Sequence, residues 1–316
     1  MSDSGLSKKL LLAIAVAALS GCSGGGGSGS DPDPEPTPTP DPVDQTPEAP
    51  AFSGKAADGY LASALVCLDL NANLKCDAGE PTTLTDGAGN YTLEATDEQK
   101  AAYSVVVKAI AGQTIDLDNP DHTIENAFTL TAPPGQEFVS PLSTLIVKAL
   151  KDNPSFTPEQ AAEKVRADFG LPDGIDITAD YIAGNDVSTH ELAQRINAAI
   201  AGALKNATDD AGGDAVEDNL NALLDYILDD VNKHAAEIAA ADTPDDVPVF
   251  DPIDDDTSLE DITTDSDSDG VNDASDAFPQ DPEETRDNDS DGVGDNEDTD
   301  DDNDGYSDED ELFAGT

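Results

Sequence analysis

The last fifth of the chain repeats one spacing of oxygen-bearing side chains three times. Acidic residues occupy positions 1, 3, 5, 9 and 12 of each copy, glycine occupies position 6, and position 7 can offer its backbone carbonyl. The first copy holds Asp265, Asp267, Asp269, Val271, Asp273 and Asp276; the second holds Asp287, Asp289, Asp291, Val293, Asp295 and Asp298; the third holds Asp300, Asp302, Asp304, Tyr306, Asp308 and Glu311. This is the ligand spacing of a calcium-binding loop.

The spacing follows from the shape of a tightly curled loop. Alternate residues point inward to one centre, and glycine permits the turn that brings later ligands around the ion. Ca²⁺ takes about six to eight oxygens, and only a hard cation of flexible geometry suits so many carboxylates. Glu311 is long enough for bidentate ligation, whereas Asp276 and Asp298 are shorter. We therefore expect calcium, at affinities of about 10⁻⁴–10⁻³ M, as in extracellular modules.

The run from Asp265 to Glu311 resembles thrombospondin type 3 repeats, including the connector from Asp276 to Pro282. Animal members of that family have a cysteine where this chain has Phe278, so the resemblance implies loops made rigid by ions without disulfides. The spacing from Asp287 to Asp300 leaves no room for the flanking helix of an ordinary EF-hand. The alternative is a disordered acidic tail that only solvates the protein.

The N-terminus has the layout of an export signal. Lys8 and Lys9 precede an apolar run, Leu10 to Leu19, that is shorter than a membrane span of about 20 residues. Leu19-Ser20-Gly21-Cys22 resembles the bacterial lipobox, which implies that residues 1–21 are removed and that Cys22 is acylated. A plain secretory signal and an incidental core helix are the alternatives.

The residues after Cys22 suggest a destination and a tether. Ser23, and not an aspartate, follows Cys22, so resemblance to lipoprotein sorting implies a lipid-anchored protein of the outer membrane. Which face of that membrane it occupies stays open at this point, and the cell surface is our expectation. Residues 22–50 are rich first in Gly and Ser and then in Pro, a composition typical of a tether without a fold.

Residues 51–139 predict a small antiparallel β-sandwich, because short β-forming runs alternate with turn signals. Gly87 to Asn90 marks a tight hairpin. The expected strands are Tyr60–Leu68, Thr82–Thr85, Tyr91–Leu93, Ser104–Ile110, Thr114–Leu117 and Ala127–Thr131. The stretch from Gly54 to Leu93 resembles the prealbumin-like modules of bacterial surface proteins.

A fourth candidate calcium loop lies inside this β module. Its positions 1, 3, 5, 9 and 12 are Asp69, Asn71, Asn73, Asp77 and Glu80. Position 6 is Leu74, although that turn favours glycine. The alternative is a polar connection whose side chains satisfy their own turns. Cys67 and Cys76 are the cysteines left once Cys22 is acylated, and exported chains meet an oxidising compartment, so we expect a disulfide between them.

Residues 140–242 predict a small helical bundle, because the apolar spacing changes to three and four residues. Ser140 and Pro141 suit the start of the first helix. Capping boxes are expected at Thr157–Gln160, for a helix that Gly170 ends, and at Ser188–Glu191. A fourth helix is expected from Ala215 to Ala241, with Val216, Leu220, Leu223, Ile227, Val231, Ala235 and Ile238 on its apolar side. Residues 243–264 read as an acidic linker.

The predicted fold is therefore multidomain α+β: a β-sandwich, a helical bundle and calcium-ordered loop repeats (residues 265–316), joined by disordered linkers. A net charge of −55, with 14 Lys and Arg against 69 acidic residues, excludes nucleic acid as a partner. Since the three histidines, His122, His190 and His234, show no metal-ligand spacing and no phosphate-binding glycine loop is found, we expect no enzymatic activity.

The expected role is that of a calcium-binding structural or adhesive lipoprotein at the cell surface, with a surface protein or polysaccharide as ligand. Two rivals remain: a surface or periplasmic hydrolase with its site in the helical domain, and a passive calcium-binding spacer. Each rival would need evidence beyond the sequence pattern.

The lipid anchor is tested by metabolic labelling with palmitate. The chain should take up label through Cys22, because acyl chains are attached to the cysteine of a lipobox, and Cys22→Ala should abolish the label. Ser23→Ala is the matched control and should keep it. Label that persists in Cys22→Ala would contradict the anchor.

Overall fold

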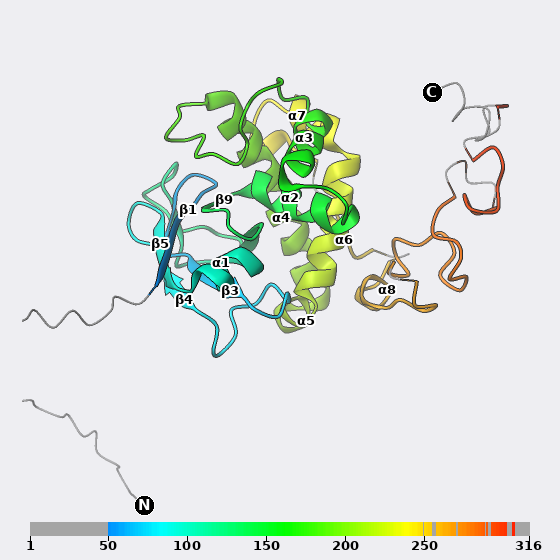
Figure 1. Cartoon of the computed structure of the whole chain (residues 1–316), viewed down its shortest axis with the longest axis horizontal. Helices are drawn as coiled ribbons and strands as arrows, with labels where there is room; N and C mark the ends of the chain where they lie inside the picture. Colours follow the sequence, from blue (N-terminus) through cyan, green and yellow to red (C-terminus); the bar gives the residue numbers. More distant parts are fainter. Residues whose placement is uncertain are drawn as a thin grey trace, which may run out of the picture. The chain divides into compact units, whose positions relative to one another are not determined.

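The computed structural model describes residues 50–248, 250–254, 257–269, 271–287, 289, 292–301 and 305–306. The predicted signal peptide, Cys22 and almost all of the predicted tether lie outside these residues. The fold is mixed α+β, as predicted, with the strands near the start of the described part and the helices after them. Figure 1 shows the strands gathered on one side and helices α2, α3, α4, α6 and α7 packed together beside them.

Two small sheets and one short pair make up the β module. The first sheet has the order β5 (Asn90–Glu94), β1 (Ala51–Ala56) and β9 (Phe138–Val139). The second has the order β4 (Thr82–Leu84), β3 (Leu65–Asp69), β6 (Ser104–Ala109) and β8 (Phe128–Ala132). The short pair joins β2 (Leu61–Ala62) to β7 (Ile115–Asp116). The predicted strands from Thr82 onward are thus confirmed to within a few residues.

The pairing of β1 corrects the prediction of a purely antiparallel module. β1 runs parallel to β9, with Lys55 opposite Phe138, although its other neighbour, β5, is antiparallel. β1 itself was not expected, because Gly54 weakens its strand pattern. That glycine is required by close packing: a Cβ there would lie 2.0 Å from the carbonyl oxygen of Glu137.

Two local features of the β module also differ from expectation. The predicted strand Tyr60–Leu68 is divided into β2 and β3 because Ser63 takes a left-handed φ of +60°. A short helix, α1 (Asp97–Ala102), was missed between β5 and β6. Thr96 and Gln99 form its capping box, a signal that the sequence carries within a single turn.

The first two predicted helices begin where the sequence indicates, and the second also ends there. α2 (Pro141–Asp152) is capped by Ser140, with Pro141 in its first turn. α3 (Pro158–Asp168) begins at the capping box of Thr157 and Gln160. It ends at Gly170, whose φ is +66° and whose N–H donates to the carbonyl of Ala167.

The start of α4 (Val187–Ala211) corrects the third predicted cap. Asp186 is the N-cap, and its carboxylate accepts the N–H of Thr189 at 3.2 Å. Ser188, the predicted cap, lies inside the helix. Aspartate and serine are about equally good at this position, so the residue two places earlier can take it. Among the described residues, no helix combines the length and the apolar composition that a membrane span needs.

The predicted fourth helix is three short helices. They are α5 (Gly213–Asp218), α6 (Leu220–Lys233) and α7 (Ala235–Ala240), with breaks at Asn219 and His234. At the first break the N–H of Asn219 is shared between the carbonyls of Ala215 and Val216. The predicted apolar side is nevertheless confirmed, because all seven of its residues are buried.

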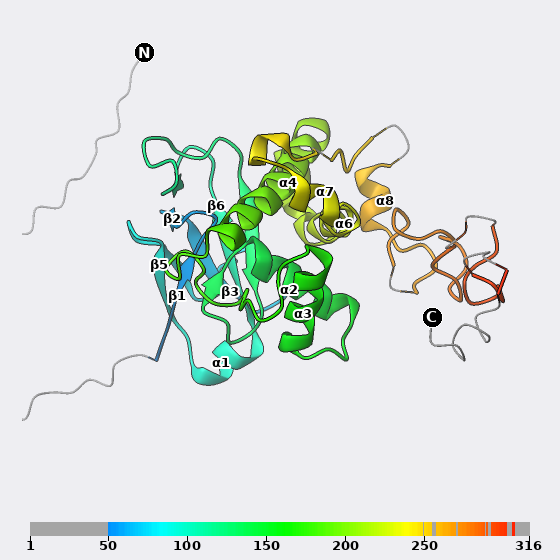
Figure 2. The same cartoon turned by 90° about the horizontal axis from the view of Figure 1, so that it is seen from above.

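One apolar core crosses the predicted boundary between residues 139 and 140. α2 packs on β8, and α4 packs on both α2 and α6, so that α2 and α4 lie between the strands and α6 (Figure 2). Leu130 on β8 and Leu142 and Ile146 on α2 are fully buried in this core. Separating the two parts would expose the apolar face of α2 to water.

Lys148 forms the one strongly buried charged contact between α2 and α6 among the described residues. Its side chain is 5% exposed, and its ammonium lies 2.6 Å from Asp229, 3.8 Å from Asp225 and in contact with Asp152. Burial alone would lower the pKa of Lys148, but the three carboxylates outweigh it and raise that pKa. Burial raises the pKa of Asp229, and the ammonium of Lys148 opposes this.

Replacing this lysine by an apolar residue should destabilise the protein. Lys148→Met would leave the half-buried Asp229 without its cation, whereas Asp225 would keep its contact with Lys151, and we expect a loss of about 2 kcal/mol in urea unfolding at pH 7. That figure lies below the usual range for a fully buried pair because the carboxylates keep contact with water. The loss should shrink as the pH falls through the raised pKa of Asp229, because its protonated form needs no partner.

The control is Lys164→Met. Lys164 pairs with Asp168 on the surface of α3, so its replacement should change stability by less than about 0.5 kcal/mol. Equal losses in the two variants would contradict the special role of Lys148.

Candidate metal centres

The first acidic loop is shaped by hydrogen bonds from its own backbone. It follows α8 (Leu259–Thr263), whose Ile262 is fully buried in the apolar core. Asp265 accepts the N–H of Ser268 at 2.7 Å, Asp267 accepts that of Asp269 at 3.2 Å, and Asp269 accepts that of Val271 at 2.8 Å. Each carboxylate at position 1, 3 or 5 therefore accepts an N–H from two or three residues later, and these bonds bend the backbone into a tight loop.

Three carboxylates of this loop meet at one place. Ligand oxygens of Asp265, Asp267 and Asp269 all lie within 4.8 Å of one another, and within the described part of the chain no other acidic, histidine or cysteine group of three does so. The Oδ2 atoms of Asp267 and Asp269 are buried without a hydrogen-bond partner. Like charges this close repel unless a cation lies between them.

Asp276 brings position 12 of the same loop to this cluster. Its side chain is 8% exposed, and its Oδ1 accepts the N–H of Phe278 at 2.8 Å. Burial raises the pKa of Asp276, and the carboxylates of Asp269 and Asp267 raise it further. Asp273, at position 9, is turned to Ser266 instead and accepts both its N–H and its hydroxyl. A position-9 ligand often acts through water, which fits that orientation.

The second and third loops are described only in part, and both show the expected turn. Gly292 and Gly305, at position 6, take φ values of +91° and +95°. Their N–H groups donate to the position-1 carboxylates of Asp287 and Asp300, at 2.9 and 3.1 Å. The predicted ligands Asp291, Asp302, Asp304, Asp308 and Glu311 lie outside the described residues.

Sequence reasoning missed Glu284, which lies between the first two loops. Its side chain is 7% exposed, and its Oε2 accepts the N–H of Asn296 at 3.0 Å. Gly294 makes room for it, because a Cβ there would lie 2.1 Å from Oε2. Glu284 thus joins the segment between the first two loops to the second loop. The pattern of positions could not reveal it, because Glu284 falls outside the twelve-residue spacing.

The loop in the β module has the same local geometry as the tail loops. Leu74, at position 6, takes a left-handed φ of +59°, and its N–H donates to Asp69 at 2.8 Å, as the glycines of the tail do. The N–H of Asn73 donates to Asn71 at 3.2 Å and that of Lys75 to Asn73 at 2.8 Å, matching the contacts at positions 5 and 7 of the first tail loop. A leucine therefore adopts the conformation for which glycine was expected.

The predicted ligands of this loop are close together but also satisfy one another. Asp77 accepts the side-chain amides of Asn71 and Asn73, and these bonds lower its pKa. Glu80 accepts the N–H groups of Leu70 and Asp77 and so joins the end of the loop to its beginning. A cation at this place needs amide oxygens where Asn71 and Asn73 now present their NH₂ groups to Asp77. Rotating the two amide groups by half a turn would present those oxygens.

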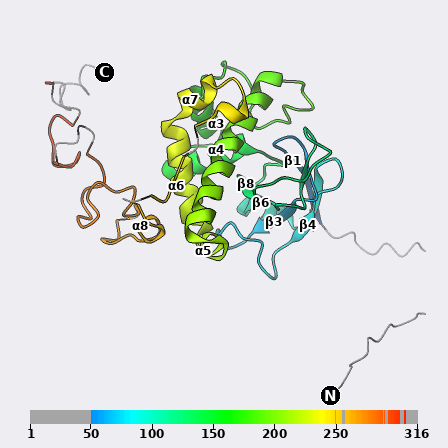
Figure 3. The same cartoon turned by 180° about the vertical axis from the view of Figure 1, so that it is seen from behind.

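A disulfide and two helices hold this loop in place. The predicted Cys67–Cys76 bond is confirmed, with 5.5 Å between the Cα atoms. The side chain of Asn221 on α6 donates to the carbonyl of Ala72, and Lys75 pairs with Asp218 on α5 at 3.1 Å. Figure 3 shows α5 on the same side of the molecule as β3 and β4, between which the loop runs.

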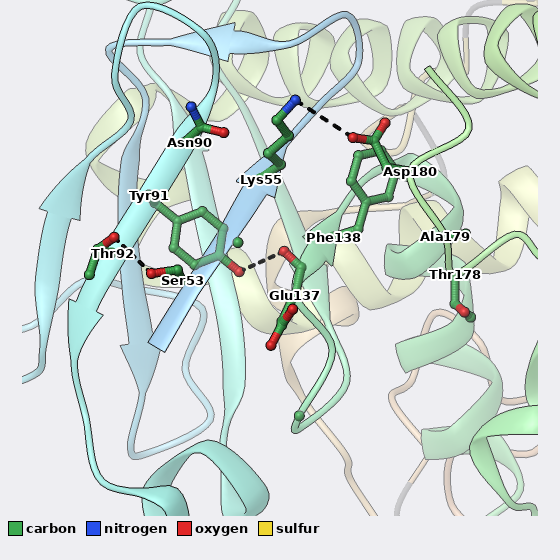
Figure 4. A pocket seen from close by; sticks show the side chains of 12 residues that line it. Ser53, Lys55, Asn90, Tyr91, Thr92, Glu137, Phe138, Thr178, Ala179 and Asp180 are labelled. Carbon is green, nitrogen blue, oxygen red and sulfur yellow. Dashed lines mark hydrogen bonds and ion pairs between the residues drawn. The ribbon is translucent and has the colours of Figure 1, made fainter. Parts of the chain in front are cut away.

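A separate pocket of about 750 Å³ opens beside β1, β5 and β9 (Figure 4). The ammonium of Lys55 lies 3.7 Å from Asp180 across its mouth, and it also lies over the ring of Tyr60. Tyr91 donates its hydroxyl to the carbonyl of Glu137 at 3.0 Å. The charges that line this pocket are therefore largely paired with each other. The only part of the predicted helical domain that lines the pocket is the segment Thr178–Asp180, and no residue of the candidate calcium loops lines it.

No protein-family model matches the chain, and neither a comparison with curated proteins nor one with solved structures finds a match.

Proposed function

We propose that this protein is a calcium-binding lipoprotein of the outer-membrane surface, whose C-terminal loops take their shape from bound ions and serve a structural or adhesive role. The observation that carries the proposal is the meeting of Asp265, Asp267 and Asp269 within 4.8 Å, with two of their oxygens buried and unpartnered. The buried Asp276 adds a fourth carboxylate to the same loop.

The donor set favours calcium over other cations. Its oxygens belong to carboxylates and, at position 7, to a backbone carbonyl, which suit hard cations and not the softer metals that prefer sulfur or imidazole. Mg²⁺ demands near-ideal octahedral geometry, whereas Ca²⁺ accepts about six to eight ligands in a flexible arrangement. The Asp-rich loops, with curled backbones and side chains of different reach, fit the larger ion.

The charge of the tail supports a coupling between ions and shape. From Asp251 to Glu311 the sequence has 28 acidic residues against the single base Arg286. Without cations these carboxylates repel one another and favour an expanded chain, and bound calcium removes that repulsion at each loop. An exported, lipid-anchored chain with such a tail suits calcium-dependent adhesion to a surface protein or polysaccharide. Pull-down from intact cells with and without calcium distinguishes this role from that of a passive spacer.

The first loop is tested by one carboxylate substitution. Asp267→Asn should lower calcium affinity at that loop at least about tenfold in calorimetric titration, a change of about 1.4 kcal/mol, because a buried anionic ligand is lost. The matched control is Glu283→Gln, which removes one charge from an exposed side chain between the first two loops and should leave the titration unchanged. Equal effects of the two variants would show that calcium responds to total charge and not to a built loop.

The loop in the β module is tested through the free energy of unfolding of the protein. If it binds calcium with a dissociation constant of about 1 mM, 10 mM calcium should raise the free energy of unfolding by about 1.4 kcal/mol through this loop. Asp77→Asn should remove that part of the gain, measured by near-ultraviolet dichroism of the tyrosines during urea unfolding. Glu94→Gln, an exposed acid on β5, should not. A gain that survives Asp77→Asn would leave the loop as a polar connection.

A further inference from the structure

A buried polar contact joins the β module to α4, away from the calcium loops. Asp58 lies in the buried turn after β1, and Asn197 lies on the face of α4 that packs against it. The two side chains are 9% and 4% exposed, and the Nδ2 of Asn197 donates to the Oδ2 of Asp58 at 2.6 Å. Two planar groups of the same shape, a carboxyl and a carboxamide, therefore contact each other in the interior.

The second atom of each group has no donor. Asp58 Oδ1 and Asn197 Oδ1 are both buried without a hydrogen-bond partner. Leaving one such acceptor unsatisfied costs about 1–3 kcal/mol, and a charged one costs more. Two unsatisfied acceptors on groups already in contact are explained together by a single hydrogen between them.

We propose that Asp58 holds a proton in the folded protein and forms a reciprocal acid–amide pair with Asn197. In this pair the acid O–H of Asp58 donates to Asn197 Oδ1, while the amide N–H of Asn197 donates to Asp58 Oδ2. Both groups are then satisfied, and no charge is buried.

The surroundings disfavour the ionised form of Asp58. Asp116 on β7 and Asp118 after it face the same turn: their oxygens come within 2.7 Å of the position that a Cβ on Gly59 would occupy. Burial raises the pKa of Asp58 well above its usual value, and the charges of Asp116 and Asp118 add to this. Among the described residues no lysine or arginine forms an ion pair with these three carboxyls. Lys55, which lies on the preceding strand, pairs with Asp180 instead.

Three other polar side chains lie near the turn, and two of them contact Asp118. His190 on α4 lies 2.9 Å from Asp118 Oδ2, and Gln194 donates to the same oxygen at 2.8 Å. The hydroxyl of Tyr181 is buried without a partner, and burial raises its pKa, with Asp58 contributing. A metal ion fits this place less well than a proton. Asp58, Asp116 and Asp118 do not bring three ligand oxygens within 4.8 Å, as the first tail loop does among the described residues.

A proton held this way makes the contact between the β module and α4 sensitive to pH. Asp58 releases its proton at a pKa of about 3.9 when unfolded and at a higher pKa when folded. Between those two values the folded state holds one proton more than the unfolded state. Stability from this pair is therefore complete at low pH and is lost as the pH rises through the folded pKa.

The test compares the full chain with Asp58→Asn, whose amide can make both hydrogen bonds at any pH. The unfolding constant of the wild type divided by that of the variant should be close to one near pH 4. It should then rise by up to tenfold per pH unit, so that it is at least about tenfold higher at pH 6. Urea unfolding from pH 4 to pH 8, in excess calcium, measures both constants.

Asp121→Asn is the matched control, because Asp121 is an exposed acid in the segment after β7. Its ratio to the wild type should stay constant over the same pH range. A constant ratio for Asp58→Asn would overturn the proposal. So would a stabilisation by calcium that Asp58→Asn alone abolishes, because a metal ion would then take the place of the proton.

Infrared spectroscopy gives a second measurement that does not depend on unfolding. At pH 6 exposed aspartates are almost fully ionised, so the wild type minus Asp58→Asn difference spectrum should contain the carbonyl stretch of one protonated carboxylic acid. A difference spectrum showing only a lost carboxylate would overturn the proposal even if the variant folds poorly.

Discussion

Repulsion between carboxylates held close together is the constraint on which this structure depends. The chain has 69 acidic residues and only 14 lysines and arginines, so most carboxylates cannot have a cationic side chain as partner. Among the strands and helices of residues 50–248, several carboxylates share one cation, and others accept hydrogen bonds from neutral N–H groups. Lys148 is shared by three aspartates, and Asp69 accepts backbone N–H groups of its own loop. Asp58 has only an amide. From Asp251 to Glu311 the sequence offers the single base Arg286, and this is where external cations have most to contribute.

The two kinds of loop show how different sequences reach one conformation. In the tail, Gly292 and Gly305 take the left-handed turn at position 6 without strain. In the β module, Leu74 takes the same turn and also packs its side chain against the apolar core. The nearby disulfide limits the alternatives open to that loop, so a residue that disfavours the turn can still adopt it.

Much of the fold was predictable because its signals are local. The caps at Ser140 and Thr157 and the glycine turn at Gly170 each act within one helical turn, and the structure confirms all three. The parallel pairing of β1 with β9 depends on residues more than eighty positions apart, and no local pattern contains it. The breaks at Asn219 and His234 were not predicted, because the apolar spacing continues through both. At each break the side chain contacts the carbonyl four residues earlier, a contact that the apolar pattern does not contain. For the candidate sites, spacing indicated the loop ligands, but Asp58, Asn197 and Glu284 matter only through neighbours brought together by the fold.

The attachment of the first acidic loop has a mechanical consequence. α8 contacts α6, and its fully buried Ile262 lies directly before that loop. The loop is also fastened back to this short helix, because Asp273 and Ala274 donate their N–H groups to the carbonyls of Thr264 and Asp261. A pull on the chain beyond this loop would therefore act first on these two hydrogen bonds, and then on the apolar contacts of Ile262 and Ala274 with the core. The force at which these contacts break would set how far the chain beyond the loop can be pulled before α6 and the apolar core are strained.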